Sequence, residues 1–179
     1  MSAIQLDVVT ARRRVGCKGP TADSWLATHG IKVPRDANSY EVDANGVLAA
    51  RLATSEFLLE STSTASDEIV GSVRNALHGG DYPKGVYPVL RADFVLDISG
   101  EQTDELFLQI CAVDLAPVAR ASSSSAGPVV MTSMIGVSVV LACRRAETEP
   151  HFTVWSDPSY STYFHSQLQA IAADVSGRY

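Results

Sequence analysis

Cysteine is scarce in this chain, and its three copies are too far apart to form a local pair. The 179 residues include Cys17, Cys111 and Cys143, and no two of these form a CxxC motif. An odd and widely spaced set is atypical of a disulfide framework, a zinc site or a redox dithiol. We therefore expect three reduced thiols and a cytoplasmic location.

Long apolar runs and an excess of positive charge are also missing. The most apolar stretch, MIGVSVVLAC, is far shorter than the roughly 20 residues that cross a bilayer. The amino-terminal segment has its arginines after its apolar residues, the reverse of a secretory signal. The formal net charge of -6 leaves no basic footprint for a phosphate backbone. We expect neither a membrane nor a nucleic acid as a partner.

The composition that remains is typical of a globular protein. Apolar residues make up 46% of the chain and charged residues 19%. A length of 179 residues fits a single domain with a sizeable core. We predict one compact domain over residues 1–179.

The first half of the chain, residues 11–80, predicts the order β-α-β-β-β-α. Alternating apolar residues indicate strands, and apolar residues three and four apart indicate helices. Asn45-Gly46 is typical of a tight hairpin turn, and Ser66 is a candidate helix cap. The predicted elements are a strand at 12–17, a helix from Pro20 to Gly30, a hairpin at 40–52, a strand at 55–60 and a helix from Ser66 to Gly79.

The second half, residues 86–179, repeats this order. Gly19 aligns with Gly100, and Phe57-Leu58-Leu59 aligns with Phe152-Thr153-Val154. The segment ASSSSAGP at 121–128 predicts a flexible inserted loop. The predicted elements are a strand at 89–100, a helix at 101–115, strands at 129–145 and 151–155, and an amphipathic helix at 157–175.

The repeated order predicts an α+β fold. We expect two ferredoxin-like β-α-β-β-β-α halves packed as one compact domain, with mainly antiparallel sheets and amphipathic helices on one face. The halves are residues 11–80 and 86–179.

Motifs that carry known chemistry are absent. The sequence has no GxGxxG after a strand and no GxxxxGK[ST], HExxH or GxSxG. The four histidines are His29, His78, His151 and His165, and no two of them have the spacing of metal ligands. We predict no catalytic, cofactor-binding or metal-binding residue on this chain.

Three places carry weaker signals, each with a structural alternative. His78 beside two glycines suits a general base or the end of a helix. Cys17 suits a reactive thiol or a small core residue. Asp93 and Asp97 could form an acid/base pair or serve as turn and cap residues. We favour the structural interpretation in each case.

Two polar segments are candidates for an interface. The first holds four cations within seven residues, which suit either a solvated strand edge or docking onto an acidic partner. The second is the serine run of the predicted loop. The candidate interface residues are Arg12, Arg13, Arg14, Lys18, Ser122, Ser123, Ser124 and Ser125.

Several segments, in their order and spacing, resemble a known family. They are RVGCKGPTADSWLATHGIKVP, RLATSEFLLE, VLDISG, ICAVDLAP and HFTVWSDPSYSTYFHSQLQAIA. Read together, they resemble the gamma subunit of heterotetrameric sarcosine oxidase, which is itself similar to the folate-binding domain of aminomethyltransferase and to YgfZ-like proteins. Gly16, Lys18 and Gly19 fill the G-x-K-G positions, whereas Ala53-Thr54-Ser55 replaces the family's Gly-Pro-Asp.

The resemblance implies a gamma-type subunit with no catalytic residue of its own. It implies an alpha subunit that binds NAD and tetrahydrofolate, a beta subunit that holds FAD and FMN, and a small delta subunit that carries zinc. The whole complex would oxidise sarcosine or a related N-methyl amine or amino acid, in one-carbon metabolism.

Two other functions stay open. The chain could be a free-standing folate-binding, aminomethyltransferase-like module in which Arg12, Arg13 or Arg14 meets the glutamate tail. It could also be a scaffold without an enzyme partner. Tight folate binding, or the absence of a flavoprotein partner, would separate these alternatives from the first.

Overall fold

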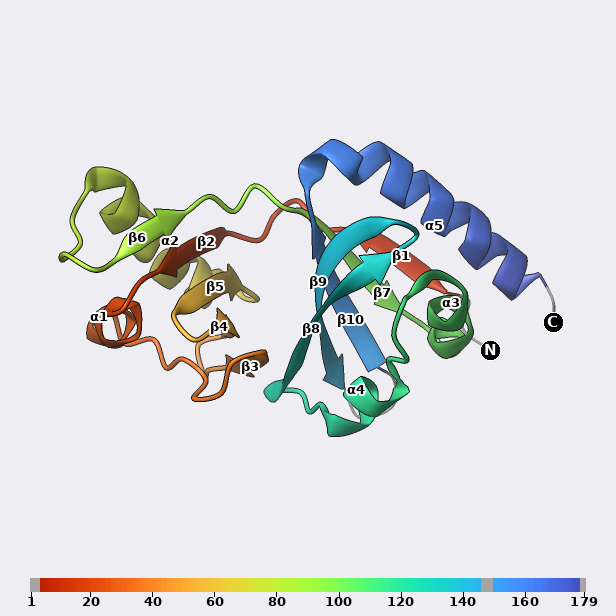
Figure 1. Cartoon of the computed structure of the whole chain (residues 1–179), viewed down its shortest axis with the longest axis horizontal. Helices are drawn as coiled ribbons and strands as arrows, with labels where there is room; N and C mark the ends of the chain where they lie inside the picture. Colours follow the sequence, from red (N-terminus) through yellow and green to blue (C-terminus); the bar gives the residue numbers. More distant parts are fainter. Residues whose placement is uncertain (1–3, 146–149, 178–179) are drawn as a thin grey trace. The chain divides into compact units, whose positions relative to one another are not determined.

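The computed structural model describes residues 4–145 and 150–177, and the chain divides into two compact units (Figure 1). The N-unit is Ala11–Ala92. The C-unit consists of the described residues of Met1–Thr10 and Asp93–Tyr179.

The N-unit is a five-stranded antiparallel sheet with two helices on one face. The strand order is β3-β4-β5-β2-β6. Apolar residues of α1, α2 and one face of the sheet form its core, among them Trp25, Phe57 and Val73. The elements are β2 (Arg14–Lys18), α1 (Ala22–Thr28), β3 (Ser39–Val42), β4 (Val47–Ala53), β5 (Glu56–Ser61), α2 (Thr64–Gly79) and β6 (Tyr87–Val89).

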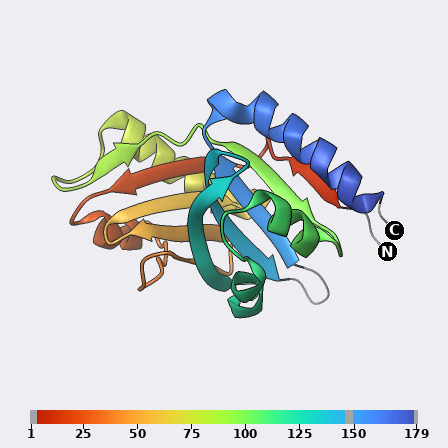
Figure 2. The ribbon, with the colours of Figure 1, turned by 45° about the vertical axis from the view of Figure 1, so that its right-hand side comes forward.

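The C-unit has the same design. Its antiparallel strand order is β1-β7-β10-β9-β8, and its core joins one sheet face to α3 and α5. Figure 2 shows α5 running alongside these strands. The elements are β1 (Gln5–Val8), β7 (Phe94–Ser99), α3 (Thr103–Ile110), α4 (Ala116–Ala121), β8 (Ala126–Met134), β9 (Val137–Arg145), β10 (Pro150–Ser156), η1 (Pro158–Tyr160) and α5 (Ser161–Ser176).

The two sheets also share their strand register. Cys17 of β2 pairs with Phe57 of β5, and Ile98 of β7 pairs with Phe152 of β10. β2 and β7 are each followed directly by a glycine with positive φ, which is 126° at Gly19 and 120° at Gly100. The outer strands differ in origin, because β6 follows α2 along the chain whereas β1 precedes the whole N-unit.

The predicted α+β class with mainly antiparallel sheets is confirmed. The ferredoxin-like description of the halves is not confirmed, because each unit has five strands, three of which form a meander. β6 pairs within the N-unit and β1 within the C-unit. The bounds of the predicted halves, 11–80 and 86–179, stay a prediction. A single domain over 1–179 stays a prediction.

The helix predicted at 101–115 ends early. α3 stops at Ile110, and Cys111 pairs with Met134 at the end of β8. Ile135 N donates to Ile110 O at 2.9 Å and Ala112 N to Ser133 O at 3.0 Å. These long-range backbone hydrogen bonds replace the helical ones, and a separate short helix, α4, follows.

The cap predicted for α2 lies three residues too late. Ser63, not Ser66, is the N-cap residue, and its hydroxyl accepts the N–H of Ser66 at 3.2 Å. The Ser66 hydroxyl accepts the N–H of Ser63 at 2.9 Å in return. This reciprocal pair is a capping box in which serine replaces the usual Glu or Gln.

Candidate functional site

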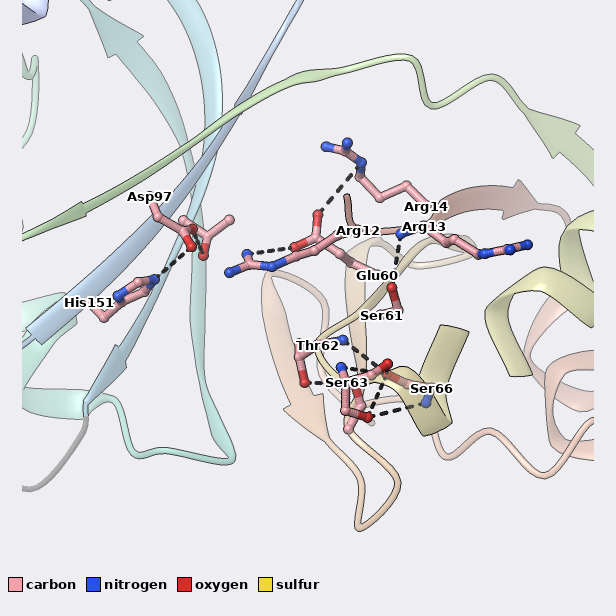
Figure 3. A network of polar contacts seen from close by, with 12 residues as sticks. Arg12, Arg13, Arg14, Glu60, Ser61, Thr62, Ser63, Ser66, Asp97 and His151 are labelled. Carbon is pink, nitrogen blue, oxygen red and sulfur yellow. Dashed lines mark hydrogen bonds and ion pairs between the residues drawn. The ribbon is translucent and has the colours of Figure 1, made fainter. Parts of the chain in front are cut away.

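A buried carboxylate held by two arginines lies on the N-unit sheet, on the face away from the helices (Figure 3). Glu60 of β5 is 0% exposed and lies directly opposite Arg14 of β2. Its Oε1 is 3.1 Å from Arg12 Nη1, and its Oε2 is 3.7 Å from Arg14 Nε. Burying a charge is unfavourable unless opposite charges are close, so the arginines stabilise Glu60 in its place.

The predicted cation cluster therefore divides in two. Arg12 and Arg14 turn inward to Glu60, whereas the side chains of Arg13 and Lys18 are exposed. β2 pairs with β5 from Arg14 to Lys18, but with β6 only from Gly16 to Lys18. The interpretation as a solvated strand edge stays a prediction. The role of all four residues at an interface stays a prediction.

The backbone of Arg13 is tied to the start of α2. Its N–H donates to the Ser61 hydroxyl at 2.9 Å, and its carbonyl accepts the Ser61 N–H at 2.9 Å. The Ser61 hydroxyl also donates to Asp67. The Arg13 guanidinium passes so close to α2 that a Cβ at Gly71 would lie 3.0 Å from its Nη1. The cluster is thus anchored between a strand and a helix.

A second ion pair on the same sheet uses the gap left by a glycine. Arg91 Nη2 lies 2.9 Å from Glu56 Oε1. A Cβ at Gly16 would lie 2.9 Å from Arg91 Nε, so the missing side chain makes room for the guanidinium. Sequence reasoning missed Glu60 and Arg91. The alternation Glu56, Leu58, Glu60 was the available signal, because it places two carboxylates on one face of β5.

The C-unit has its own buried carboxylate, Asp97, which is 5% exposed (Figure 3). The Thr153 hydroxyl donates to its Oδ1 at 2.7 Å, and His151 Nε2 lies 3.0 Å from its Oδ2. Asp7 of β1 lies opposite Asp97 in the strand register. A carboxylate that orients an imidazole is one part of a general-base arrangement. The Thr153 hydroxyl, however, donates its hydrogen bond to Asp97, so it links β10 to β7.

The expected alternative of an Asp93 and Asp97 acid/base pair does not form as one site. Asp97 lies within β7, whereas Asp93 precedes the strand. Asp93 instead lines a hollow of about 420 Å³ with Trp155 and Asp157, and Asp97 is not part of that lining. Hydrogen bonds from the hydroxyl and the backbone N–H of Ser159 lower the pKa of Asp157, which caps η1. The structural interpretation of these carboxylates is the better one.

The two buried cysteines are unreactive thiols. Burial raises the pKa of Cys17 to about 12 and the pKa of Cys143 to about 11. The thiolate is the reactive form, so neither side chain is a nucleophile at neutral pH. The interpretation of Cys17 as a small core residue is confirmed.

The serine run and His78 occupy ordinary structural places. Ser122 is buried beside Cys143 and donates to the Val118 carbonyl at 2.7 Å, whereas Ser123, Ser124 and Ser125 are exposed. The predicted loop is shorter than expected, because β8 begins at Ala126. His78 is exposed in the last turn of α2, which confirms the helix-end interpretation.

Residues 4–145 and 150–177 contain neither a metal-ligand cluster nor a helix suited to a membrane. In that part of the chain, no three His, Cys, Asp or Glu side chains come together in a way that could hold a metal ion. Among the same residues, no helix is long and apolar enough to span a membrane.

Comparison with known proteins finds likeness in structure rather than in sequence. No family model and no curated protein sequence matches this chain. A chain of heterotetrameric sarcosine oxidase from Corynebacterium sp. U-96, solved in complex with pyrrole 2-carboxylate, has a similar structure, with a TM-score of 0.71 and 21% identity. The similarity covers 97% of this chain and 85% of that chain.

A second solved structure is similar over a smaller share of its own length. Aminomethyltransferase T of the glycine cleavage system from Bartonella henselae has a TM-score of 0.61 and 13% identity. The similarity covers 93% of this chain and 45% of the aminomethyltransferase. The protein thus has a fold that occurs in heterotetrameric sarcosine oxidase and in part of an aminomethyltransferase.

Proposed function

We propose that this protein is a gamma-type, non-catalytic subunit of a heteromeric flavin-dependent oxidoreductase. The substrate of the complex is sarcosine or a related N-methyl amine or amino acid. The observation that carries the proposal is the two-way coverage of the sarcosine oxidase chain, 97% of this protein against 85% of that one. A shared fold over nearly the whole of both chains supports a shared role, whereas the aminomethyltransferase is matched over less than half its length.

The proposal includes partners and the cofactors that they hold. The partners are alpha, beta and delta subunits. NAD and tetrahydrofolate belong to alpha, FAD and FMN to beta, and zinc to delta. The assembly is cytoplasmic, in agreement with the wide cysteine spacing.

The polar clusters support a structural role for the chain. Glu60 is surrounded by Arg12 and Arg14, and Asp97 accepts the Thr153 hydroxyl. Glu60 links β5 to β2 and to Arg12 just before β2, and Asp97 links β7 to β10. Such contacts stabilise a scaffold, and in this proposal the chemistry takes place on the partner subunits.

Affinity purification tests the proposal. A tagged full-length chain is purified from its native host, and the eluate is analysed by mass spectrometry and by its absorbance spectrum. We expect larger flavoprotein subunits and a flavin spectrum in the eluate, and neither in a tag-only control. A colourless eluate that contains the chain by itself would contradict the proposal.

A free-standing folate-binding, aminomethyltransferase-like module is the second candidate. It is favoured by the similarity of 93% of this chain to part of an aminomethyltransferase. Calorimetry of the isolated chain with tetrahydrofolate separates the two functions. Tight binding without a flavoprotein partner would favour this second candidate. A scaffold with neither folate nor a flavoprotein would be the third outcome.

A further inference from the structure

An apolar hollow of about 290 Å³ lies between α3 and α4 of the C-unit. Phe107 and Leu115, each 2% exposed, form its buried part. Leu108 and Val113 also line it, but they are 73% and 42% exposed. Single exposed apolar side chains are ordinary on a protein surface, but two beside an apolar hollow indicate a contact surface.

Two carboxylates stand at the edge of this hollow. Asp104 and Asp114 are part of its lining and are exposed. Asp114 accepts the N–H of Ala116 at 2.9 Å and so begins α4, and Asp104 lies one turn before Leu108 on α3. Neither makes an ion pair with any residue of 4–145 or 150–177. Their negative charge is therefore not neutralised within the described structure.

The hollow also lies in the most acidic part of the chain. Residues 93–119 contain six Asp and Glu residues and no Lys or Arg. The remaining Asp and Glu residues equal the 14 Lys and Arg in number, so this segment accounts for the whole net charge of -6. Of these six carboxylates, Asp97 is buried, whereas Glu101, Asp104 and Asp114 are exposed. Exposed carboxylates attract positive charge and repel negative charge.

We propose that the α3–α4 hollow is a docking site for a segment of a partner protein in which Lys or Arg residues flank an apolar side chain. The apolar side chain contacts Phe107 and Leu115 between the exposed Leu108 and Val113, and the cations face Asp104 and Asp114. This inference rests on the proposed function, because it names the surface through which a subunit of an assembly meets its partner.

The dimensions and charge of the hollow favour a protein segment over other ligands. Small-molecule sites usually have volumes of roughly 300–1,000 Å³, and this one is at the lower limit. The phosphates of nucleic acids and the anionic headgroups of membranes would be repelled by the acidic rim. An apolar anchor in a desolvated pocket with charges at the rim is the common arrangement of a protein–protein contact.

Photo-crosslinking from the hollow identifies the occupant. The full-length chain, with benzoylphenylalanine in place of Leu108, is expressed in the native host, irradiated and digested for mass spectrometry. The matched control carries the same group at Leu90, which is 85% exposed in the N-unit. We expect position 108 to crosslink to a partner segment that has Lys or Arg beside an apolar residue, and position 90 not to reach that segment. No crosslink from 108, or one to lipid, to a second copy or to an acidic segment, would overturn the proposal.

Substitutions then measure the contribution of each feature. Leu108→Asp, in a chain without the crosslinking group, should reduce co-purification of the partner that the crosslink identified by at least about tenfold. The substitution puts a charge at the centre of the contact. Asp104→Lys should slow association and weaken its salt dependence. Leu90→Asp and Asp81→Lys are matched controls that should leave both quantities unchanged. Equal effects of the test and control variants would contradict the proposed site.

Failure of this inference can be told apart from failure of the proposed function. If flavoprotein subunits co-purify with the chain but position 108 crosslinks to none of them, the docking site is wrong and the function stands. If position 108 crosslinks to a cationic segment of a protein that has no flavin, the docking site stands and the function is wrong.

Discussion

The N-unit and the C-unit use the same strand register but put their buried carboxylates at different positions. If Gly19 is matched with Gly100, the Arg14–Glu60 pair of the N-unit corresponds to Val95–Trp155 of the C-unit. In the other direction, Asp97–Thr153 of the C-unit corresponds to Gly16 and Leu58. Equivalent positions on this face can therefore carry an ion pair, a hydrogen bond or apolar side chains without a change in strand pairing.

The opposite face of each sheet is more alike between the units. Cys17 and Phe57 of the N-unit occupy the places of Ile98 and Phe152 of the C-unit, and all four are buried in their own helix-covered cores. The helix-covered face must be apolar to bury the helices, whereas the other face is free to vary. The shared register supports the predicted repeat, although its boundaries stay a prediction.

The largest expected loss of folding stability is at Glu60. Glu60→Gln removes the negative charge but leaves Arg14, whose side chain is 10% exposed, without its counter-charge. Breaking a buried ion pair in this way should lower the free energy of unfolding by about 3–5 kcal/mol, measured by urea denaturation. The control is Glu56→Gln, in a more exposed pair with Arg91, which should cost less than about 1 kcal/mol. Equal stability of Glu60→Gln and the wild type would contradict the role given to the pair.

The two equivalent glycines sharpen the comparison. Gly19→Ala and Gly100→Ala each put a side chain on a backbone with positive φ, which costs about 1–3 kcal/mol. At Gly19 the new Cβ would also lie 2.1 Å from the Gly85 carbonyl oxygen. We therefore expect Gly19→Ala to lower the free energy of unfolding by about 2–3 kcal/mol. A smaller loss than that of Gly100→Ala would show that the clash is relieved elsewhere.

Asp97→Asn should have a smaller effect than Glu60→Gln. Asp97 accepts the neutral Thr153 hydroxyl, and the side chain of His151 beside it is 33% exposed, against 10% for Arg14 beside Glu60. Weakening hydrogen bonds to a charged group should cost about 1–2 kcal/mol in urea denaturation. Thr153→Val is the matched control, because it removes the donor and keeps the shape of the side chain. A loss at Asp97 as large as that at Glu60 would erase the distinction between the units.

Titration of the buried thiols should change folding stability least, and this change should be undetectable at neutral pH. Burial raises the pKa of these thiols from an ordinary value of 9.0 to about 12 for Cys17 and about 11 for Cys143. As the pH rises past 9, the unfolded chain loses these protons first, so the contribution to stability is full below pH 9 and falls toward pH 11–12.

Urea denaturation at pH 8 and pH 10 checks this sign. The Cys17→Ala, Cys143→Ala double variant should lose less stability between the two pH values than the wild type, since it lacks the two titrating groups. An identical fall in both proteins would show that other groups account for the whole pH dependence.

Much of the fold could be predicted because local pattern and tertiary packing agree. The amphipathic helix predicted at 157–175 corresponds to α5, which buries Phe164, Leu168, Ala172 and Val175. Asn45-Gly46 falls in the turn between β3 and β4. The missed strands, β1 and β6, are short and largely exposed, so they carry little periodic signal. Their place depends on long-range pairing with β7 and β2.

The candidate sites could be predicted less well, for a related reason. The cation cluster at Arg12 to Lys18 is visible in the sequence, but its counter-charge at Glu60 is 48 residues away from Arg12. Likewise, Asp97 and Thr153 are 56 residues apart. Which charges are neutralised depends on strand register, and register is fixed by the assembled sheet rather than by local sequence.

Native mass spectrometry of the complex purified from the host tests the central claim most directly. The proposed function predicts that the chain, of 19.1 kDa, is released by gentle activation from a larger assembly that also contains flavin-bearing subunits. Detection of the chain by itself, or bound to partners that carry no flavin, would contradict the claim that it is a subunit of a flavin-dependent oxidoreductase.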